Sequence, residues 1–259
     1  MGSGVVATLR DPAGAAARRK RACGRGGAPG RIHHDAPTDA ISLLGMNTVV
    51  VTDELQDYLD GLLSARDPVL ARMEEEAHRE NIPIVDAHEG AFLYLLVRIA
   101  GAKRVLELGT AIGYSGIWLL RGTSGGNLTT YEIDPERALR ARANFAAAGL
   151  AKQALVLEEN AVTGLEKLNA RFDACFIDLL NGFKSEDVTR KAFDLCLQHL
   201  DGGGLLIADN ALRQGEVVKP KNQQARNVAF YNELVATNPR LESVVVPIRD
   251  GVSVARVKD

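Results

Sequence analysis

The sequence predicts an α/β domain built on a doubly wound, mainly parallel sheet that ends in an antiparallel hairpin. From residue 104 onward, short apolar runs typical of strands alternate with amphipathic segments typical of helices. Five such strand–helix units follow one another, and this alternation is typical of a parallel sheet with helices on both faces. The chain then closes on "LESVVVPIRDGVSVARV", two valine-rich runs joined at Asp250-Gly251, which predicts a hairpin and one antiparallel strand.

The first 45 residues differ from everything that follows them. "GAAARRKRACGRGGAPG" is rich in Gly, Ala and Arg and has no apolar periodicity, so it cannot bury enough surface to order itself. We therefore expect residues 1–45 to be a disordered extension and residues 46–259 to form a single domain that begins with helices. A transit peptide, a basic arm and a translation start at Met46 all stay open as explanations of the extension.

The stretch between Thr52 and the first strand predicts helices. Thr52 precedes an acidic turn, as is typical of a helix start, and leucines then recur at helical spacing. Pro68 divides this stretch in two, because proline is tolerated only in the first turn of a helix. A further helix is expected over residues 87–100.

The five strand–helix units follow in order. The predicted strands are "RVLELG", "NLTTYEID", "QALVLEE", "FDACFID" and "LLIADN". The helices that follow them are "YSGIWLLRG", "PERALRARANFAAAG", "AVTGLEKLNA", a helix over residues 186–199, and "NQQARNVAFYNELVATN". Sheets of this kind bind ligands beyond the carboxyl ends of their parallel strands, so polar residues at strand ends are the candidates for a functional site.

Composition excludes several classes of protein. A net charge of -2 gives no general attraction to nucleic acid or to an anionic membrane. No apolar run approaches the roughly 18 residues that a membrane span requires. The cysteines, Cys23, Cys175 and Cys196, are few and have no metal-binding spacing, which favours a reducing compartment such as the cytoplasm.

The ends of the first three strands predict a nucleoside pocket. The first strand ends in "LELGTAIGYS", where Gly109 and Gly113 allow a tight turn and a close approach of a ligand to the backbone. A third glycine is missing, so this is not the dinucleotide-binding pattern. Glu132 ends the second strand, where an acid can accept hydrogen bonds from a ribose diol. Asn160 and Ala161 follow the third strand, where an adenine ring could be held.

Together these segments resemble a known family. "VLELGTAIGYSGIWLL", "YEIDPE", "FDACFID", "GGLLIADNAL" and "VPIRDGVSVARV" look like the S-adenosylmethionine-dependent O-methyltransferases of the catechol and caffeoyl-CoA type. The resemblance covers about residues 84–258. It implies the seven-stranded, doubly wound, Rossmann-like methyltransferase sheet, S-adenosylmethionine as the methyl donor, and a homodimer.

The resemblance also implies which residues bind the cofactor. They are Val85, Glu107, Gly109, Gly113, Tyr114, Ser115, Glu132, Asn160, Ala161 and Asp178. The resemblance implies that Glu132 binds the ribose and that Asn160 and Ala161 hold the adenine edge. It also implies that Val85 closes over the methionine part, which is lined by Glu107, Gly109, Gly113, Tyr114 and Ser115.

Polar residues at the ends of the fourth and fifth strands predict a metal site. Asp178 ends the fourth strand, and Asp209 and Asn210 end the fifth. These strands are expected to be neighbours, so three oxygen ligands would meet at one edge of the sheet, a set that suits Mg²⁺, Mn²⁺ or Ca²⁺. Capping of local turns by the same side chains is the alternative. In the family that the chain resembles, such a cation orients a catechol-like acceptor and lowers the pKa of its hydroxyl.

One position departs from the family pattern. The family has a lysine three residues after the first aspartate, and this chain has Asn181 there, which cannot act as a base. Lys184 is the replacement we expect, with a solvated loop lysine and proton loss to water as the alternatives.

The leading hypothesis is a divalent-metal-dependent transfer of a methyl group from S-adenosylmethionine to a hydroxyl of a small catechol-like or hydroxycinnamoyl-like acceptor. The cation is expected to be Mg²⁺. A tRNA hydroxyuridine O-methyltransferase is the alternative activity, although the acidic balance of the core argues against a nucleic-acid partner. A cofactor-binding homologue with weakened catalysis is the alternative outside enzymes, and Asn181 is its support.

Overall fold

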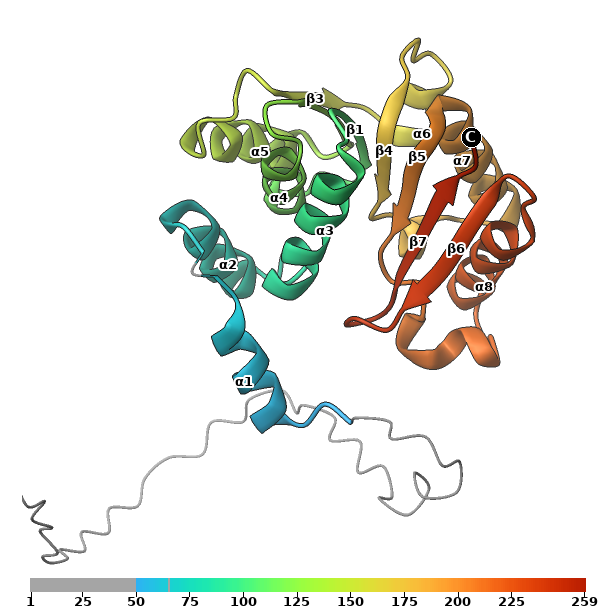
Figure 1. Cartoon of the computed structure of the whole chain (residues 1–259), viewed down its shortest axis with the longest axis horizontal. Coiled ribbons are helices and arrows are strands. Elements are labelled where there is room, and N and C mark those ends of the chain that lie inside the picture. Colours follow the sequence, from blue (N-terminus) through green and yellow to red (C-terminus); the bar gives the residue numbers. More distant parts are fainter. Residues whose placement is uncertain (1–49, 65) are drawn as a thin grey trace, which may run out of the picture. The chain divides into compact units, whose positions relative to one another are not determined.

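A computed structural model describes residues 50–64 and 66–259, which contain one seven-stranded sheet (Figure 1). The strands are β1 (Arg104–Leu108), β2 (Asn127–Glu132), β3 (Ala154–Glu158), β4 (Phe172–Ile177), β5 (Leu200–Ala208), β6 (Leu241–Val246) and β7 (Val252–Val257). Their order is β3-β2-β1-β4-β5-β7-β6. Strands β1 to β5 pair in parallel, whereas β7 runs antiparallel to both β5 and β6. The predicted mainly parallel sheet with its C-terminal hairpin is confirmed.

The helices are α1 (Asp53–Leu62), α2 (Pro68–Glu80), α3 (Ala87–Ala100), α4 (Tyr114–Gly122), α5 (Pro135–Ala147), α6 (Ala161–Leu165), α7 (Glu186–His199) and α8 (Gln223–Thr237). Two short 3₁₀ turns, η2 (Leu180–Gly182) and η3 (Arg213–Val218), lie in the loops after β4 and β5. Polar N-caps explain where several helices begin: the side chains of Thr52, Asp67 and Asp86 each accept a first-turn backbone N–H. Pro68 is the first residue of α2, as its tolerance for the first turn predicts.

Apolar side chains form one core on each face of the sheet. Successive strand residues point to opposite faces, so Val105 of β1 packs into the first core and Leu106 into the second. The first core joins the sheet to α2, α3, α4 and α5, and it includes Leu93 and Phe145. The second joins it to α6, α7 and α8, and it includes Phe193. The sheet is therefore covered by helices on both faces, which leaves the strand ends as the accessible edges.

Two elements differ from their predicted bounds. Strand β5 begins at Leu200, before the glycine triplet, whereas the sequence predicts that the triplet is a loop. Gly203 has a φ of 78°, and the pairing register of β4 with β5 shifts between Phe172 and Ala174, so the glycines are accommodated by an irregularity in the sheet. Helix α6 ends at Leu165, five residues early. Beyond it the backbone turns more tightly, since the N–H of Leu168 donates to the carbonyl oxygen of Leu165, at 3.2 Å, and the ring of His199 contacts the same oxygen, at 3.0 Å.

Residues 51–259 form one compact unit. The predicted extension, residues 1–45, lies outside the described residues, so its disorder and the domain boundary stay predictions. Among the helices of the described part, none combines the length and the apolar character needed to cross a membrane.

Candidate functional site

The loop between β1 and α4 is shaped by its two predicted glycines. Gly109 and Gly113 have φ values of 100° and 91°, a region that favours glycine. A Cβ atom on Gly109 would lie 2.8 Å from the backbone oxygen of Asp178. The N–H of Gly109 also donates to the carbonyl oxygen of Tyr131, at 3.1 Å. The loop therefore lies directly against the ends of β2 and β4, where a side chain would not fit.

Glu107 and Ser115 meet beneath this loop. The Ser115 hydroxyl donates to one carboxylate oxygen of Glu107, at 2.7 Å, and the Thr130 hydroxyl donates to the other, at 2.6 Å. Glu107 has no exposed surface. Burial raises its pKa to about 7, although the two hydrogen bonds act in the opposite direction.

Glu132 fixes the tip of the same loop from the end of β2. Its two carboxylate oxygens accept the N–H of Ala111, at 2.8 Å, and the N–H of Asp134, at 2.9 Å. Each oxygen keeps a second lone pair, so the carboxylate can still accept hydrogen bonds from a ribose diol. Its orientation is set before any ligand arrives.

A cavity of about 550 Å³ lies beside the loop, at the carboxyl ends of the parallel strands. Its lining includes Gly109, Glu132, Ile133, Asn160, Ala161 and Leu179. Apolar walls with a few fixed polar groups are typical of small-molecule sites. Four of the predicted cofactor residues, from the ends of three strands, thus line one cavity.

Asn160 has a structural task as well as its place in this cavity. Its side-chain oxygen accepts the N–H groups of Val162 and Thr163, at 3.0 and 3.2 Å, and so caps α6. The cap fixes the start of α6 and places Ala161 in the cavity wall.

The side chains of Val85 and Tyr114 lie elsewhere. The Tyr114 hydroxyl donates to Glu74 of α2, at 2.6 Å, and its ring packs edge-on against Trp118. Val85 is buried in the first core and lines a different hollow, next to α1 and α2. Neither residue lines the cavity described above, so their predicted contact with a cofactor stays a prediction.

Asp178 and Asp209 lie at neighbouring strand ends, as the sequence predicts. The N–H of Asp178 donates to Leu108 at the end of β1, and the N–H of Asp209 donates to Ile177 at the end of β4. The loss of solvent around Asp178, followed by the negative charge of Asp209, raises the pKa of Asp178 to about 8. Burial also raises the pKa of Asp209. We call the edge that carries Asp178, Asp209 and Asn210 the acidic rim.

Asn181 is bonded to this rim. Its side-chain amide donates to the side-chain oxygen of Asn210, at 2.8 Å, and its own oxygen accepts the Arg213 guanidinium, at 2.7 Å. Lys184 instead lines the cavity of about 550 Å³, together with Asn160. The residue at the family's lysine position therefore links the rim to Arg213, whereas the predicted replacement lines the cavity and, among the described residues, makes no hydrogen bond or ion pair with the rim.

Two residues of the rim were not predicted. Glu89, in the first turn of α3, has no exposed surface, and one of its oxygens accepts the Arg249 guanidinium at 2.7 Å. The same guanidinium lies 3.5 Å from Asp209. Burial, followed by the charge of Asp209, raises the pKa of Glu89 to about 9. Glu89 and Arg249 are 160 residues apart, and neither belongs to a local pattern that marks a site. The one sign in the sequence that could have pointed to this pair is an acidic residue, Glu89, in a largely apolar predicted helix.

The donor chemistry of the rim fits a hard divalent cation. Asp178, Asp209 and Asn210 offer carboxylate and amide oxygens, and the second oxygen of Glu89 is buried with no hydrogen-bond partner. Within residues 50–64 and 66–259, however, no three His, Cys, Asp or Glu side chains form a ready metal-binding group. The predicted set has only two such residues and relies on Asn210 for its third ligand.

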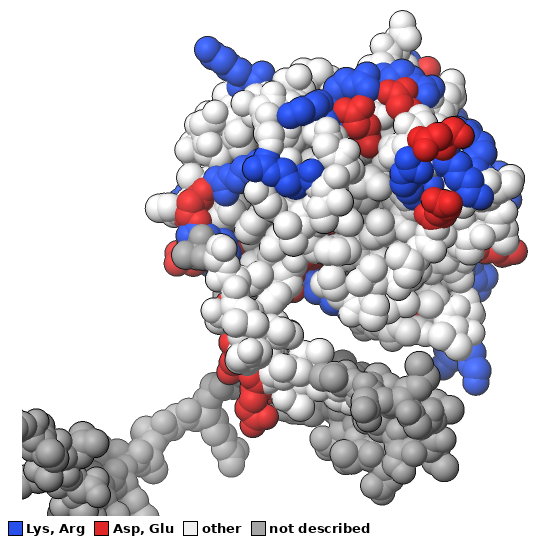
Figure 2. Space-filling model, viewed as in Figure 1, with Lys and Arg blue, Asp and Glu red and all other residues white. Residues whose placement is uncertain are grey.

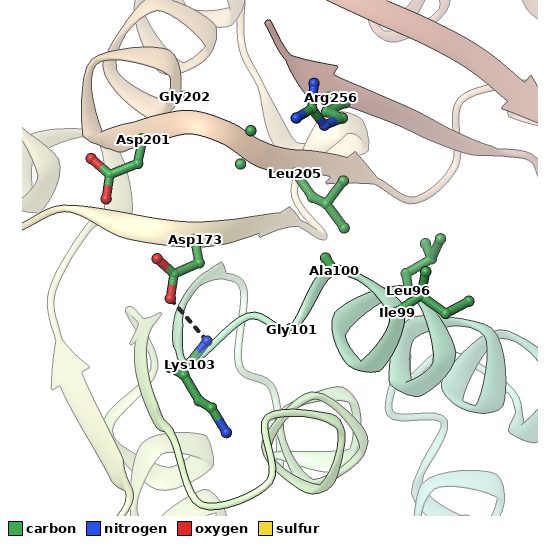
Figure 3. Close-up of a pocket in the computed structure, with 12 residues that line it drawn as sticks. Leu96, Ile99, Ala100, Gly101, Lys103, Asp173, Asp201, Gly202, Leu205 and Arg256 are labelled. Atoms are coloured by element: carbon green, nitrogen blue, oxygen red, sulfur yellow. Dashed lines mark hydrogen bonds between the residues drawn. The ribbon is translucent and has the colours of Figure 1, made fainter. Parts of the chain in front are cut away.

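A second cavity, of about 740 Å³, lies at the opposite edge, between the start of β5 and the end of α3 (Figure 3). Its charged groups are already paired. Asp173 and Asp201 both bind Arg104, and Arg256 binds Asp259. The Lys103 ammonium donates to the carbonyl oxygens of Thr123 and Ser124. These side chains therefore serve the fold. On the face in view in Figure 2, basic and acidic side chains are interleaved in the same way.

Comparisons with known proteins cover most of the chain. A family model described as O-methyltransferase matches residues 63–258. The chain is 29% identical over 225 residues to a catechol O-methyltransferase of Niastella koreensis, a match that covers 80% of this chain and 98% of the relative. It is similar, at 30% identity and a TM-score of 0.71, to an O-methyltransferase of Bacillus cereus solved in complex with SAH, with 79% of this chain and 97% of the other covered. At 27% identity and a TM-score of 0.71, it is similar to TomG of Streptomyces achromogenes, solved with SAM, with 80% and 96% covered.

Proposed function

The chain belongs to the O-methyltransferase family, and we propose that it methylates a hydroxyl of a small catechol-like or hydroxycinnamoyl-like acceptor with the help of a divalent cation, Mg²⁺. Its methyl donor is S-adenosylmethionine, the cofactor of its solved relatives. The observation that carries the proposal is the position of Asp178. Its backbone touches the glycine loop at Gly109, and its carboxylate ends the strand next to Asp209. Hard oxygen ligands thus lie beside the cofactor loop.

The residues of the chain divide the task between them. Glu132 is placed to bind the ribose, and the apolar wall of Ile133 and Leu179 to hold the base and exclude water. Asp178, Asp209 and Asn210 would hold the cation. When bound, the cation would grip adjacent oxygens of the acceptor and lower the pKa of the attacking hydroxyl. Much of the rate would then come from the alignment of that oxygen with the methyl group.

We also propose a homodimer in a reducing compartment, the cytoplasm. The dimer is supported by the family resemblance. The compartment is supported by Cys175 and Cys196, because both belong to the second core and both are free thiols rather than a disulfide. Light scattering of the purified protein tests the dimer, because a monomer at assay concentration would contradict it.

A methyl-transfer assay tests the activity. Labelled S-adenosylmethionine is offered with a panel of catechols and hydroxycinnamates, with EDTA, and with EDTA followed by excess Mg²⁺. Methylation that EDTA abolishes and Mg²⁺ restores is the expected result. Methyl transfer that survives EDTA would contradict the requirement for a cation. Methyl transfer to a tRNA that carries hydroxyuridine, with none to catechols, would favour the alternative activity. Cofactor binding with no transfer to any acceptor would favour a homologue with weakened catalysis.

A further inference from the structure

Arg249 lies among carboxylates that come from two distant parts of the chain. It belongs to the turn between β6 and β7, and its guanidinium is 2.7 Å from Glu89 and 3.5 Å from Asp209. It also lies 3.4 Å from Asp86, the N-cap of α3. One positive charge therefore joins the hairpin, the start of α3 and the end of β5.

The backbone around Arg249 fixes this position. Arg249 has a φ of 49°, which is uncommon for a residue with a side chain. The turn is bonded to the segment after Asn210: the N–H of Ala211 donates to Gly251, at 2.8 Å, and the N–H of Leu212 donates to Asp250, at 2.7 Å. The guanidinium thus reaches the acidic rim from a turn that is fastened to the rim itself.

The rim has more negative groups than Arg249 can satisfy. Glu89 is completely buried, and the guanidinium binds only one of its two oxygens, so the other has no partner. Asp178 adds a further carboxylate beside Asp209, and the structure gives its side chain no hydrogen bond to another described residue. Carboxylates gathered where little water reaches repel one another unless a positive charge lies among them. Arg249 is the positive charge that meets them in the described part of the chain.

We propose that Arg249 is a positioning residue that serves as the internal counter-charge of the acidic rim: it holds Glu89 and Asp209 together while no divalent cation is bound, and it lowers the affinity of the rim for that cation. The inference rests on the proposed function, because it assumes that Asp209 is a cation ligand. An arginine stays charged at every relevant pH, so a divalent cation must approach Asp209 against a fixed positive charge. Unit charges a few ångströms apart interact more strongly at a partly buried site than in water, so the repulsion between the guanidinium and the cation should be measurable.

Titration with Mn²⁺ of the full chain, followed by calorimetry, tests the inference without any acceptor. Arg249→Gln removes the charge and keeps a polar side chain. We expect it to bind Mn²⁺ at least about tenfold more tightly than the unmodified chain. Arg249→Lys keeps the charge and should stay near the unmodified affinity. Arg256→Gln, which removes an arginine of the same hairpin far from the rim, is the matched control and should leave Mn²⁺ affinity unchanged.

The melting temperature gives a second measurement. Without a metal, Arg249→Gln should melt below the unmodified chain, because Glu89 loses its partner. Mn²⁺ should then raise the melting temperature of this variant by more than it raises that of the unmodified chain. A purely structural arginine would lower the first value without enlarging the second.

The outcomes separate the inference from the proposed function. Equal or weaker Mn²⁺ binding by Arg249→Gln would overturn the inference alone. If neither the unmodified chain nor any variant binds Mn²⁺, the proposed cation fails and the inference fails with it. If Arg249→Gln does not fold, Glu89→Gln is compared with Glu89→Gln plus Arg249→Gln, which leaves no buried acid unpaired at residue 89. The double variant must then bind Mn²⁺ more tightly than the single one.

Discussion

Glu132 combines a structural contact with the chemistry expected of a ribose-binding acid. Both of its oxygens hold backbone N–H groups, one of them at the tip of the glycine loop. A carboxylate held in this way loses little freedom when a ligand binds, so its hydrogen bonds contribute more fully to affinity.

We expect Glu132→Ala to weaken the binding of S-adenosylhomocysteine by about 10- to 100-fold, the effect of losing one charge-assisted hydrogen-bonding group. Calorimetry measures it. Glu158→Ala is the matched control, because Glu158 pairs in register with Glu132 at the end of β3 and is exposed. Equal affinities of the two variants would contradict the assignment of Glu132.

Glu107 makes stability depend on pH. Its pKa is about 7 in the folded protein, above its ordinary value of 4.5. Between these two values the folded state binds more protons than the unfolded state, so the free energy of unfolding falls as the pH rises. The contribution is complete below pH 4.5 and lost above about pH 7.

Comparison with Glu107→Gln isolates this contribution, since the other buried acids titrate in both proteins. The free energy of unfolding of the unmodified chain, minus that of the variant, should fall by about 3 kcal/mol between pH 4.5 and 7. Urea unfolding at a series of pH values measures the difference. A difference that stays constant over this range would show that folding does not raise the pKa of Glu107.

Lys184 can be assigned by two measurements on one variant. As a base it would leave cofactor binding alone, so Lys184→Ala would lower turnover steeply while the affinity for S-adenosylhomocysteine holds. Lys184 also lines the cavity of about 550 Å³, so it could instead contribute only to cofactor binding. In that case Lys184→Ala would lower the affinity for S-adenosylhomocysteine. Lys191→Ala, which removes a second lysine of the same cavity, is the control. Unchanged turnover would eliminate Lys184 as the base.

At the scale of single elements, the glycine loop is the part of the site with the least tolerance. Gly109→Ala must accept both a left-handed backbone and a contact of 2.8 Å with the oxygen of Asp178. Gly125→Ala has a similar φ, 90°, but open space around the new methyl group. Both changes should cost roughly 1–2 kcal/mol of backbone strain.

Only Gly109→Ala should cost more than this strain and also weaken the binding of S-adenosylhomocysteine. Urea unfolding and calorimetry of the two variants provide the test. Equal losses of stability, with cofactor affinity intact in both, would mean that the loop can move away from β4.

The elements themselves could be predicted where local chemistry decides them. Apolar runs that end on Asp178 and Asp209 placed both acids at the correct edge, because strand direction and strand order follow from the alternation of strands and helices. The bounds of α6 could not be predicted from local sequence, and the carbonyl oxygen of its last residue, Leu165, contacts the ring of His199 on another helix. Likewise, Leu180 and Phe183 are buried around η2, and this burial accompanies the placement of Lys184 in the lining of the cavity of about 550 Å³.

Contacts between residues far apart in the sequence are the part of the site that could not be predicted. In the sequence, Arg249 is a turn residue beside Asp250-Gly251, and Glu89 is an acid in the first turn of a predicted helix, where acids are common. Their hydrogen bond exists only because the hairpin and α3 reach the same edge of the sheet. Tyr114 shows the same limit, because its hydroxyl goes to a partner in α2, 40 residues earlier.

At the scale of the whole molecule, every candidate site residue lies in the unit formed by residues 51–259. We therefore expect a chain that begins at Met46 to bind S-adenosylhomocysteine with the affinity of the full chain. Side-by-side calorimetry of the two proteins checks this. A loss of more than about tenfold, or 1.4 kcal/mol, would assign residues 1–45 a part in the site.

The order of the sheet has a consequence for how the protein folds. Strand β7 follows β6 in the sequence, yet it lies between β5 and β6 and pairs antiparallel with both. Within the described residues, β6 is therefore joined to the sheet through β7, and the two strands have to dock together as a hairpin. Because the turn of this hairpin carries Arg249, docking of β7 also brings the arginine to the acidic rim. A change that disrupts the pairing of β7 with β5 would therefore detach β6 and disturb the acidic rim at the same time.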